Sequence, residues 1–188
     1  MHFLKVKQLF FDRAAVKNAL DNGPSEGHGG SAYPLSGFKG SSREGGVRVP
    51  CIMRWPGKIP PNQVQDAPAA IKDLLTTLVP LAGGTVPTDR VIDGEDLWPL
   101  LTGKDPNSPN DAYYYFHTNK IRGVQIDDWK FIPDGEEGQG LYNLGDDIGE
   151  HQNVIDQYPD IAHDLQTNMT TFDLELEATS RPRGEYIE

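Results

Sequence analysis

The sequence contains one cysteine, Cys51, so an intrachain disulfide is excluded. Cys51 lies in the apolar run from Val47 to Met53, which predicts a buried structural thiol rather than a reactive one. The sequence also lacks a run of about 18 apolar residues, the length that indicates a membrane-spanning helix. Lysines interrupt the apolar residues of Met1–Phe11 and no small-residue cleavage site follows, so this segment is a poor signal peptide. The cellular location is therefore left open by the sequence.

Basic residues are few relative to acidic ones. The chain has 17 Lys and Arg against 28 Asp and Glu, which gives a net charge of -11. Such a surface repels nucleic acid and anionic membranes, and we expect neither as a partner. An anionic substrate would need a local basic pocket, and the basic residues between Lys39 and Lys58 are the nearest candidates. Most of the remaining charges are expected to form a solvated surface.

Glycine and proline, in contrast, are abundant, with 20 and 15 residues among 188. They predict a loop-rich chain, of a length that suits one domain or one domain with a small appendage. Asp21–Gly46 is dominated by Gly, Ser and Pro and is expected to form a long ordered loop. Long loops inside compact domains are usually functional.

The segments that flank this loop carry weaker periodic patterns. Met1–Leu20 has partial helical spacing and is interpreted as a weak helix. Val47–Arg54 is predicted to be a short apolar strand. Apolar residues recur at helical spacing over Ile71–Leu78, with Asp73 as the expected N-cap. A short helix or turn is expected within 91–101.

Strand-like patterns dominate after residue 110. The predicted strands are Ala112–Phe116, Ile121–Ile126, Trp129–Ile132 and Leu141–Leu144. Asp127-Asp128 fits a tight turn between the second and third of these strands. Pro159 suits the first turn of a final helix. The apolar stripe expected on that helix consists of Ile161, Leu165, Met169, Phe172 and Leu176.

Asp21-Asn22-Gly23 is the first motif that could carry chemistry. A carboxylate and an amide oxygen are ligands suited to Ca²⁺ or Mg²⁺. The alternative is an ordinary turn, because Asn-Gly tolerates positive φ. Two adjacent ligands cannot complete a calcium site, which needs roughly six to eight oxygens.

Lys39 is the second candidate. It lies close to glycines, so it could approach an anion with help from backbone N–H groups, although an exposed loop lysine is the alternative. Glu44 and Arg48 are expected to form a buried ion pair that holds the loop, rather than to act in catalysis. His28 is interpreted as a loop histidine without a catalytic role.

Several segments occur together in an order that resembles a known family. They are Asp21–Pro24, Pro34–Gly40, Arg43–Pro50, Arg54–Ile59, Asp73–Leu78, Val91–Leu97, Pro99–Gly103, Trp129-Lys130, Leu141–Leu144 and Gly149–Asn153. Each is modest alone, but in this order they resemble the carboxy-terminal half of the type I sulfatases. These are the arylsulfatase-like members of the alkaline phosphatase superfamily.

The resemblance implies an α/β fold. Residues 21–106 would be the end of a mixed-sheet sulfatase catalytic domain. Residues 107–188 would be a small carboxy-terminal α+β subdomain with an antiparallel sheet and one packed helix. Residues 1–20 are left unassigned, because they fit poorly the apolar strand that precedes Asp-Asn-Gly in the family.

The resemblance also implies a sulfuric ester hydrolase that acts on a sulfate ester, with calcium as cofactor. Asp21 and Asn22 resemble one pair of calcium ligands, and Lys39 resembles the lysine that contacts the sulfate. The family's nucleophile is a formylglycine made from a C/S-x-P-S-R motif. That motif is absent, and Cys51 stands in a different context. The sequence thus predicts a truncated or frameshifted sulfatase, with an incomplete calcium site and no activity by itself.

Two other functions stay open at this point. The chain could be a non-catalytic module that binds a cation or a partner, with association through an exposed sheet edge. It could also be related to the phosphatases and phosphonate hydrolases of the same superfamily. The particular sulfate ester is not predicted.

Overall fold

Two four-stranded sheets form the framework of the chain. The structure is a computed structural model that describes residues 3–7, 15–17, 22–135 and 138–180. The first sheet has the order β2-β3-β1-β4. Its strands are β1 (Phe3–Lys7), β2 (Ala15–Lys17), β3 (Arg48–Arg54) and β4 (Val64–Gln65). Strand β1 pairs parallel to β3, while β2 and β4 pair antiparallel, so the sheet is mixed.

The helix expected over Met1–Leu20 is wrong for the described parts of that segment. Residues 3–7 and 15–17 are strands that pair with β3. Pairing with a buried strand supplies backbone hydrogen bonds that a weak local helical preference cannot match. The rest of the segment, together with Asp21, lies outside the described residues.

Strand β3 forms within the segment Val47–Arg54, where the sequence predicted a short apolar strand. It follows α1 (Glu44–Val47), a single helical turn, and its buried side chains alternate along the strand. Val49, Cys51 and Met53 pack against residues 97–101 in one apolar cluster. Cys51 is fully buried, and burial raises the pKa of its thiol to about 11. A thiol that stays protonated is a poor nucleophile, which confirms the structural assignment.

Two short helices cover this sheet, α2 (Asp73–Leu81) and α3 (Trp98–Thr102). Helix α2 exists where predicted, but Lys72 occupies its N-cap position instead of Asp73. The apolar spacing indicates its buried face only in part, because Leu74 packs against the core while the two fully buried side chains belong to Asp73 and Thr77. Ile71, Leu75 and Leu78 are among the exposed large hydrophobic residues.

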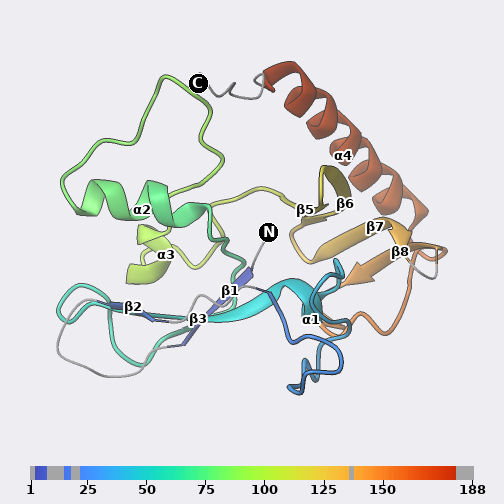
Figure 1. The fold of residues 1–188 in the computed structure, drawn as a ribbon, viewed down its shortest axis with the longest axis horizontal. Helices are drawn as coiled ribbons and strands as arrows, with labels where there is room; N and C mark the ends of the chain where they lie inside the picture. Colours follow the sequence, from blue (N-terminus) through green and yellow to red (C-terminus); the bar gives the residue numbers. More distant parts are fainter. Residues whose placement is uncertain (1–2, 8–14, 18–21, 136–137, 181–188) are drawn as a thin grey trace, which may run out of the picture.

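The second sheet is a simple antiparallel meander in the order β5-β6-β7-β8. Its strands are β5 (Tyr113–His117), β6 (Lys120–Ile126), β7 (Trp129–Gly135) and β8 (Gly138–Asn143). Helix α4 (Pro159–Thr179) runs along this sheet, on the opposite side of the molecule from α2 and α3 (Figure 1). Val124, Phe131 and Leu141 from the sheet pack with Ala162 and Leu165 from the helix.

The predicted α/β class, with a separate antiparallel sheet and one packed helix, is confirmed by this arrangement. The boundary near residue 106 stays a prediction. In the part of the chain that the structure describes, no helix combines the length and the apolar character needed to cross a membrane.

Candidate functional site

The loop from residue 22 to residue 43 folds back on α1, directly before β3, through backbone hydrogen bonds. Gly23 N donates to Gly46 O at 2.9 Å, and Gly45 N donates to Ser36 O at 2.7 Å. Lys39 N donates to Pro24 O at 2.9 Å. The last bond puts the backbone of Lys39 beside a residue only two positions after Asn22. The loop thus places the backbone of Lys39 beside the segment that contains Asn22.

Close backbone contacts leave no room for side chains at the centre of this loop. A Cβ atom built on Gly23 would lie 1.7 Å from Gly45 O. One built on Gly45 would lie 2.4 Å from Gly37 O. Since real Cβ atoms do not approach backbone oxygens so closely, glycine is the only residue that permits this packing. Asn22 itself has a φ of 66°, a conformation that asparagine tolerates better than most residues.

A recess of about 450 Å³ opens beside Asn22. It is lined by Asn22, Gly23, Pro24, Leu35, Arg48 and Pro50, together with residues 30–32, Gly45 and Val49. Asn22 is partly buried there. Lys39 is exposed and is not among the lining residues. The structure therefore puts Asn22 in the recess and Lys39 nearby on the loop, while Asp21 is outside the described residues.

The residue types at this place fit part of a calcium site. The described residues contain no group of three or more His, Cys, Asp or Glu side chains that could hold a metal ion. Asn22, whose side chain carries an amide oxygen, lines the recess, and Asp21 precedes it directly in the sequence. Both are hard oxygen donors, and roughly four or more further oxygens would be needed to complete the coordination of calcium.

A buried cluster of charged residues lies directly behind the loop. Lys130 Nζ is 2.9 Å from Glu44 Oε1 and 2.9 Å from Glu150 Oε1, and all three side chains are almost fully buried. Glu150 Oε2 accepts a hydrogen bond from Glu44 N at 2.6 Å. The Lys130–Glu150 contact is electrostatic only, because Glu150 Oε1 accepts no hydrogen bond from the described residues. The two carboxylates come from segments that are far apart in the sequence, and both contact the ammonium group of Lys130.

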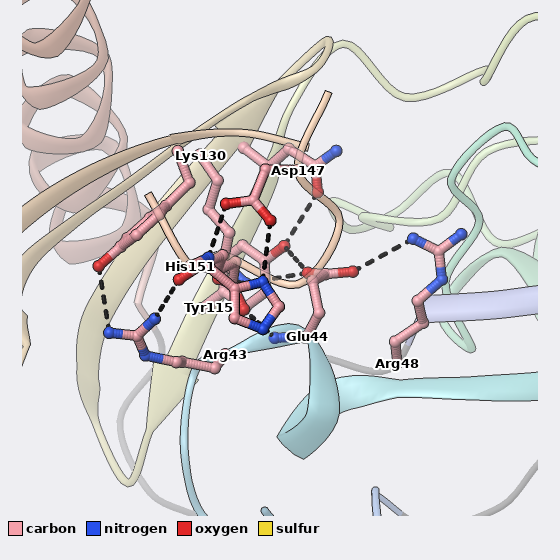
Figure 2. A network of polar contacts seen from close by, with 10 residues as sticks. Arg43, Glu44, Arg48, Tyr115, Lys130, Asp147 and His151 are labelled. Atoms are coloured by element: carbon pink, nitrogen blue, oxygen red, sulfur yellow. Dashed lines mark hydrogen bonds and ion pairs between the residues drawn. The ribbon is translucent and has the colours of Figure 1, made fainter. Parts of the chain in front are cut away.

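Two further side chains complete the surroundings of Glu44, as Figure 2 shows. Arg48 Nη1 lies 3.3 Å from Glu44 Oε2, which confirms the predicted ion pair. Tyr115 donates to Glu44 Oε1 at 3.3 Å. Burial alone would raise the pKa of Glu44, but Lys130 and then Arg48 hold it below its usual value. The carboxylate therefore stays ionised, and the cluster pairs two anions with two cations.

Arg43 and His151 lie at the edge of this cluster (Figure 2). The Arg43 guanidinium donates to Glu150 O at 2.8 Å and to the Tyr142 hydroxyl at 3.1 Å. The His151 ring is mostly exposed and lies 3.1 Å from Asp147. Burial alone would raise the pKa of Asp147, but hydrogen bonds from backbone N–H groups and from this ring hold it below its usual value. Asp147 also accepts from His151 N, so the pair stabilises the turn before α4.

His28 lies in the loop, as the sequence predicted. It is exposed in the loop and has contacts only with its neighbours Ser25 and Glu26 among the interactions described for it. The participation of Lys130 and Glu150 in the buried cluster, by contrast, was not predicted. Lys130 and Glu150 both fall in motifs that supported the family resemblance, Trp129-Lys130 and Gly149–Asn153. The signal in the sequence was the position of Lys130, a charged residue inside the otherwise apolar predicted strand Trp129–Ile132.

Comparisons with known proteins agree on one family. The chain matches the family described as N-sulphoglucosamine sulphohydrolase, C-terminal, over residues 39–175. It is 45% identical over 103 residues to the steryl-sulfatase of Rattus norvegicus, covering 55% of this chain and 18% of that protein. It is 41% identical over 113 residues to the N-acetylgalactosamine-6-sulfatase of Mus musculus, covering 60% of this chain and 21% of that protein.

A solved structure shows the same fold. The PsFucS1 sulfatase from Pseudoalteromonas sp. has a TM-score of 0.75 with 22% sequence identity, and the match covers 87% of this chain and 37% of that chain. The chain spans about a fifth of the length of the two curated relatives.

Proposed function

Because the chain belongs to the sulfatase family and corresponds to its carboxy-terminal part, we propose that its loop contributes to a sulfuric ester hydrolase active site. In this proposal Asp21 and Asn22 are calcium ligands, and Lys39 is the cation that contacts the sulfate group. The sulfatase family is generally calcium-dependent. Its members named above are sulfatases by description, so a sulfate ester is the proposed substrate class.

One observation carries the proposal. The bond from Lys39 N to Pro24 O and the bond from Gly23 N to Gly46 O bring two distant parts of the loop to the amino end of β3. A metal ligand and a cation must lie near one another to act on a single sulfate group. This loop geometry supports such an arrangement of Asn22 and Lys39.

The chemistry assigned to each group follows from its charge. Bound calcium would polarise a sulfate oxygen. The ammonium group of Lys39 would orient the anionic substrate and stabilise the charge that develops on the leaving oxygen. The nucleophile would have to come from residues other than these 188, since they contain no C/S-x-P-S-R motif. We therefore expect the 188-residue chain alone to hydrolyse no aryl sulfate above the buffer rate.

Calcium titration by calorimetry tests the metal part of the proposal. We expect the chain to bind calcium with a Kd of about 10⁻⁴ to 10⁻³ M, a range found for weak calcium sites. Asp21→Ala and Asn22→Ala should each weaken binding by about tenfold or more, because each removes an oxygen ligand. Asp156→Ala removes an exposed carboxylate far along the sequence and serves as the charge-matched control. Equal affinities in all four proteins would contradict the assignment.

An enzymatic assay separates the remaining alternatives. The chain is incubated with an aryl sulfate and, separately, with an aryl phosphate, each in the presence of calcium. Turnover of the sulfate would contradict the expected inactivity, and turnover of the phosphate alone would favour a phosphatase relative. Calcium binding without turnover agrees with a partial sulfatase site. A cation-binding module would give the same outcome. Lys39→Ala separates the two, because it should weaken sulfate binding by a partial sulfatase site and leave a module that binds only a cation unaffected.

A further inference from the structure

We propose that Glu150 and Lys130 are positioning residues, which fix the shape of the candidate site loop from the second sheet. This inference rests on the proposed function of Asn22 and Lys39, because it states what holds these two residues in place. Neither Glu150 nor Lys130 touches the recess. Their effect on the site would pass through Glu44, at the amino end of α1.

The second sheet and the segment after it hold Glu44 at two points. Glu150 Oε2 accepts from the backbone N–H of Glu44, across 106 positions of sequence. Lys130 Nζ donates to the Glu44 carboxylate, across 86 positions. One contact fixes the backbone of Glu44 and the other fixes its side chain. Because all three residues are buried, the contacts are screened by little water and define one orientation.

The residues next to Glu44 transmit this orientation to Asn22. Gly45 and Gly46 continue α1, and Gly46 O accepts the hydrogen bond from Gly23 N. Gly23 is also in direct contact with the Gly45 carbonyl, with no space for even one methyl group. A displacement of α1 would therefore move Gly23, and with it the adjacent Asn22. Densely packed backbone transmits such shifts because it cannot absorb them locally.

A second set of contacts connects the same segment to Lys39. Gly45 N donates to Ser36 O, so α1 also contacts the segment that leads to Lys39. Lys39 N donates to Pro24 O, which follows the Gly23 that packs on α1. Arg43 adds an anchor of its own, because its guanidinium donates to the carbonyl of Glu150. Glu150 therefore holds the loop through its side chain and through its backbone. Among the described residues that bond to Arg43 or Glu44 from the second half of the chain, Glu150 alone uses both its side chain and its backbone carbonyl.

The geometry also explains why charge is needed here. Two carboxylates and two cations form a neutral group in a buried place, where an unpaired charge is costly. Glu150→Gln keeps the size of the side chain and removes its charge. An amide can still accept from Glu44 N through its oxygen, but its NH₂ group faces the Lys130 ammonium or the backbone N–H. We expect this variant to loosen α1 while the sheet remains folded.

Hydrogen exchange measured by NMR at individual amides tests the positioning role. In Glu150→Gln, the amides of Gly23, Lys39 and Gly45 should exchange about tenfold faster than in the wild type, while those of β7 and β8 are unchanged. The matched control is Asp73→Asn, which alters another fully buried carboxylate that accepts three hydrogen bonds away from the loop. It should leave the three loop amides unchanged. Equal loop exchange in Glu150→Gln and the wild type would overturn the proposal, as would a uniform increase across all amides.

A milder variant keeps the test decisive if Glu150→Gln does not fold. Arg43→Gln leaves the Glu44, Lys130 and Glu150 side chains in place and removes the half-buried guanidinium that donates to the Glu150 carbonyl and to the Tyr142 hydroxyl. It should accelerate exchange at the same three amides by about threefold. No acceleration in this variant would again overturn the proposal.

Calcium titration then connects loop shape to the site. Glu150→Gln should raise the Kd for calcium about tenfold although Glu150 is no ligand, and Asp73→Asn should not change it. An unchanged Kd in Glu150→Gln would overturn the positioning role. If the wild type binds no calcium, the proposed function fails, and the exchange experiment alone decides whether Glu150 and Lys130 position the loop.

Discussion

The candidate site loop and the second sheet are stabilised in opposite ways. In the sheet, large apolar side chains such as Phe131 and Leu141 fill the space under α4. In the loop, glycines bring backbone directly against backbone, as Gly23 does with Gly45. The sheet is therefore stabilised by large side chains that fill its core, whereas the loop packs closely because its glycines have no side chain. This difference predicts that the two regions respond to opposite kinds of substitution.

Removing atoms from the sheet should have the largest effect. Phe131 is 1% exposed and lies among Val124, Leu141 and Leu165. Phe131→Ala should lower the free energy of unfolding by about 3–5 kcal/mol, because it loses apolar burial and leaves a cavity. Urea denaturation followed by circular dichroism measures this change.

Phe116→Ala is the control for this substitution. It removes the same ring from β5, where the side chain is 39% exposed. A smaller loss is expected because less apolar area is withdrawn from water. Similar losses in the two variants would show that burial under α4 does not set the stability of the sheet.

Adding atoms to the loop should have the next largest effect. A methyl group on Gly23 would overlap the Gly45 carbonyl, so Gly23→Ala must displace the backbone. We expect a loss of about 1–3 kcal/mol, the usual cost of overpacking. Ser25→Ala, which shortens an exposed side chain in the same loop, should change stability by less than about 0.5 kcal/mol. A neutral Gly23→Ala would mean that the loop is not held by close backbone contact.

The same contrast explains how far the sequence could predict the fold. The strands of the second sheet and the position of α4 were predicted nearly in full, because their apolar residues alternate or recur with the period of the element they form. Leu176 is the exception in the predicted stripe of α4, because it is exposed. The buried face of helix α2 was predicted only in part. Asp73 and Thr77 are buried because they accept hydrogen bonds from the backbone N–H groups of Glu95 and Leu97. Hydrophobic periodicity predicts which apolar residues are buried. It does not predict that polar side chains are buried because they accept hydrogen bonds from backbone N–H groups of a distant loop.

The candidate site was predicted by motif rather than by pattern. Asn22 and Lys39 were selected through the resemblance, and the backbone of the loop brings them near one another. The cluster behind them was missed because Glu44, Lys130 and Glu150 are far apart in sequence. Glu44 was predicted to pair with Arg48, but Lys130 and Glu150 were given no charged partner, and only the fold shows that they meet Glu44. Contacts of long sequence separation are where local reasoning ends.

The smallest effect sharpens what glycine does in the loop. Gly27 has a φ of 80°, but a Cβ atom built on it would meet nothing within 4 Å. Gly27→Ala should therefore cost about 1 kcal/mol through conformation alone, because alanine is disfavoured in the left-handed region. Gly27→Asn should cost less, since asparagine adopts this region more readily. Thermal unfolding of both variants, with Gly23→Ala and Gly23→Asn beside them, provides the comparison.

The order of the four variants separates space from conformation. At Gly23 the larger asparagine should be at least as damaging as alanine, because the obstacle is the Gly45 carbonyl. At Gly27 the order should reverse, because the obstacle is the backbone angle. If asparagine were worse than alanine at both positions, crowding would govern the whole loop. If it were better at both, the close contact at Gly23 would have relaxed, and the candidate site would depend less on α1 than its hydrogen bonds indicate.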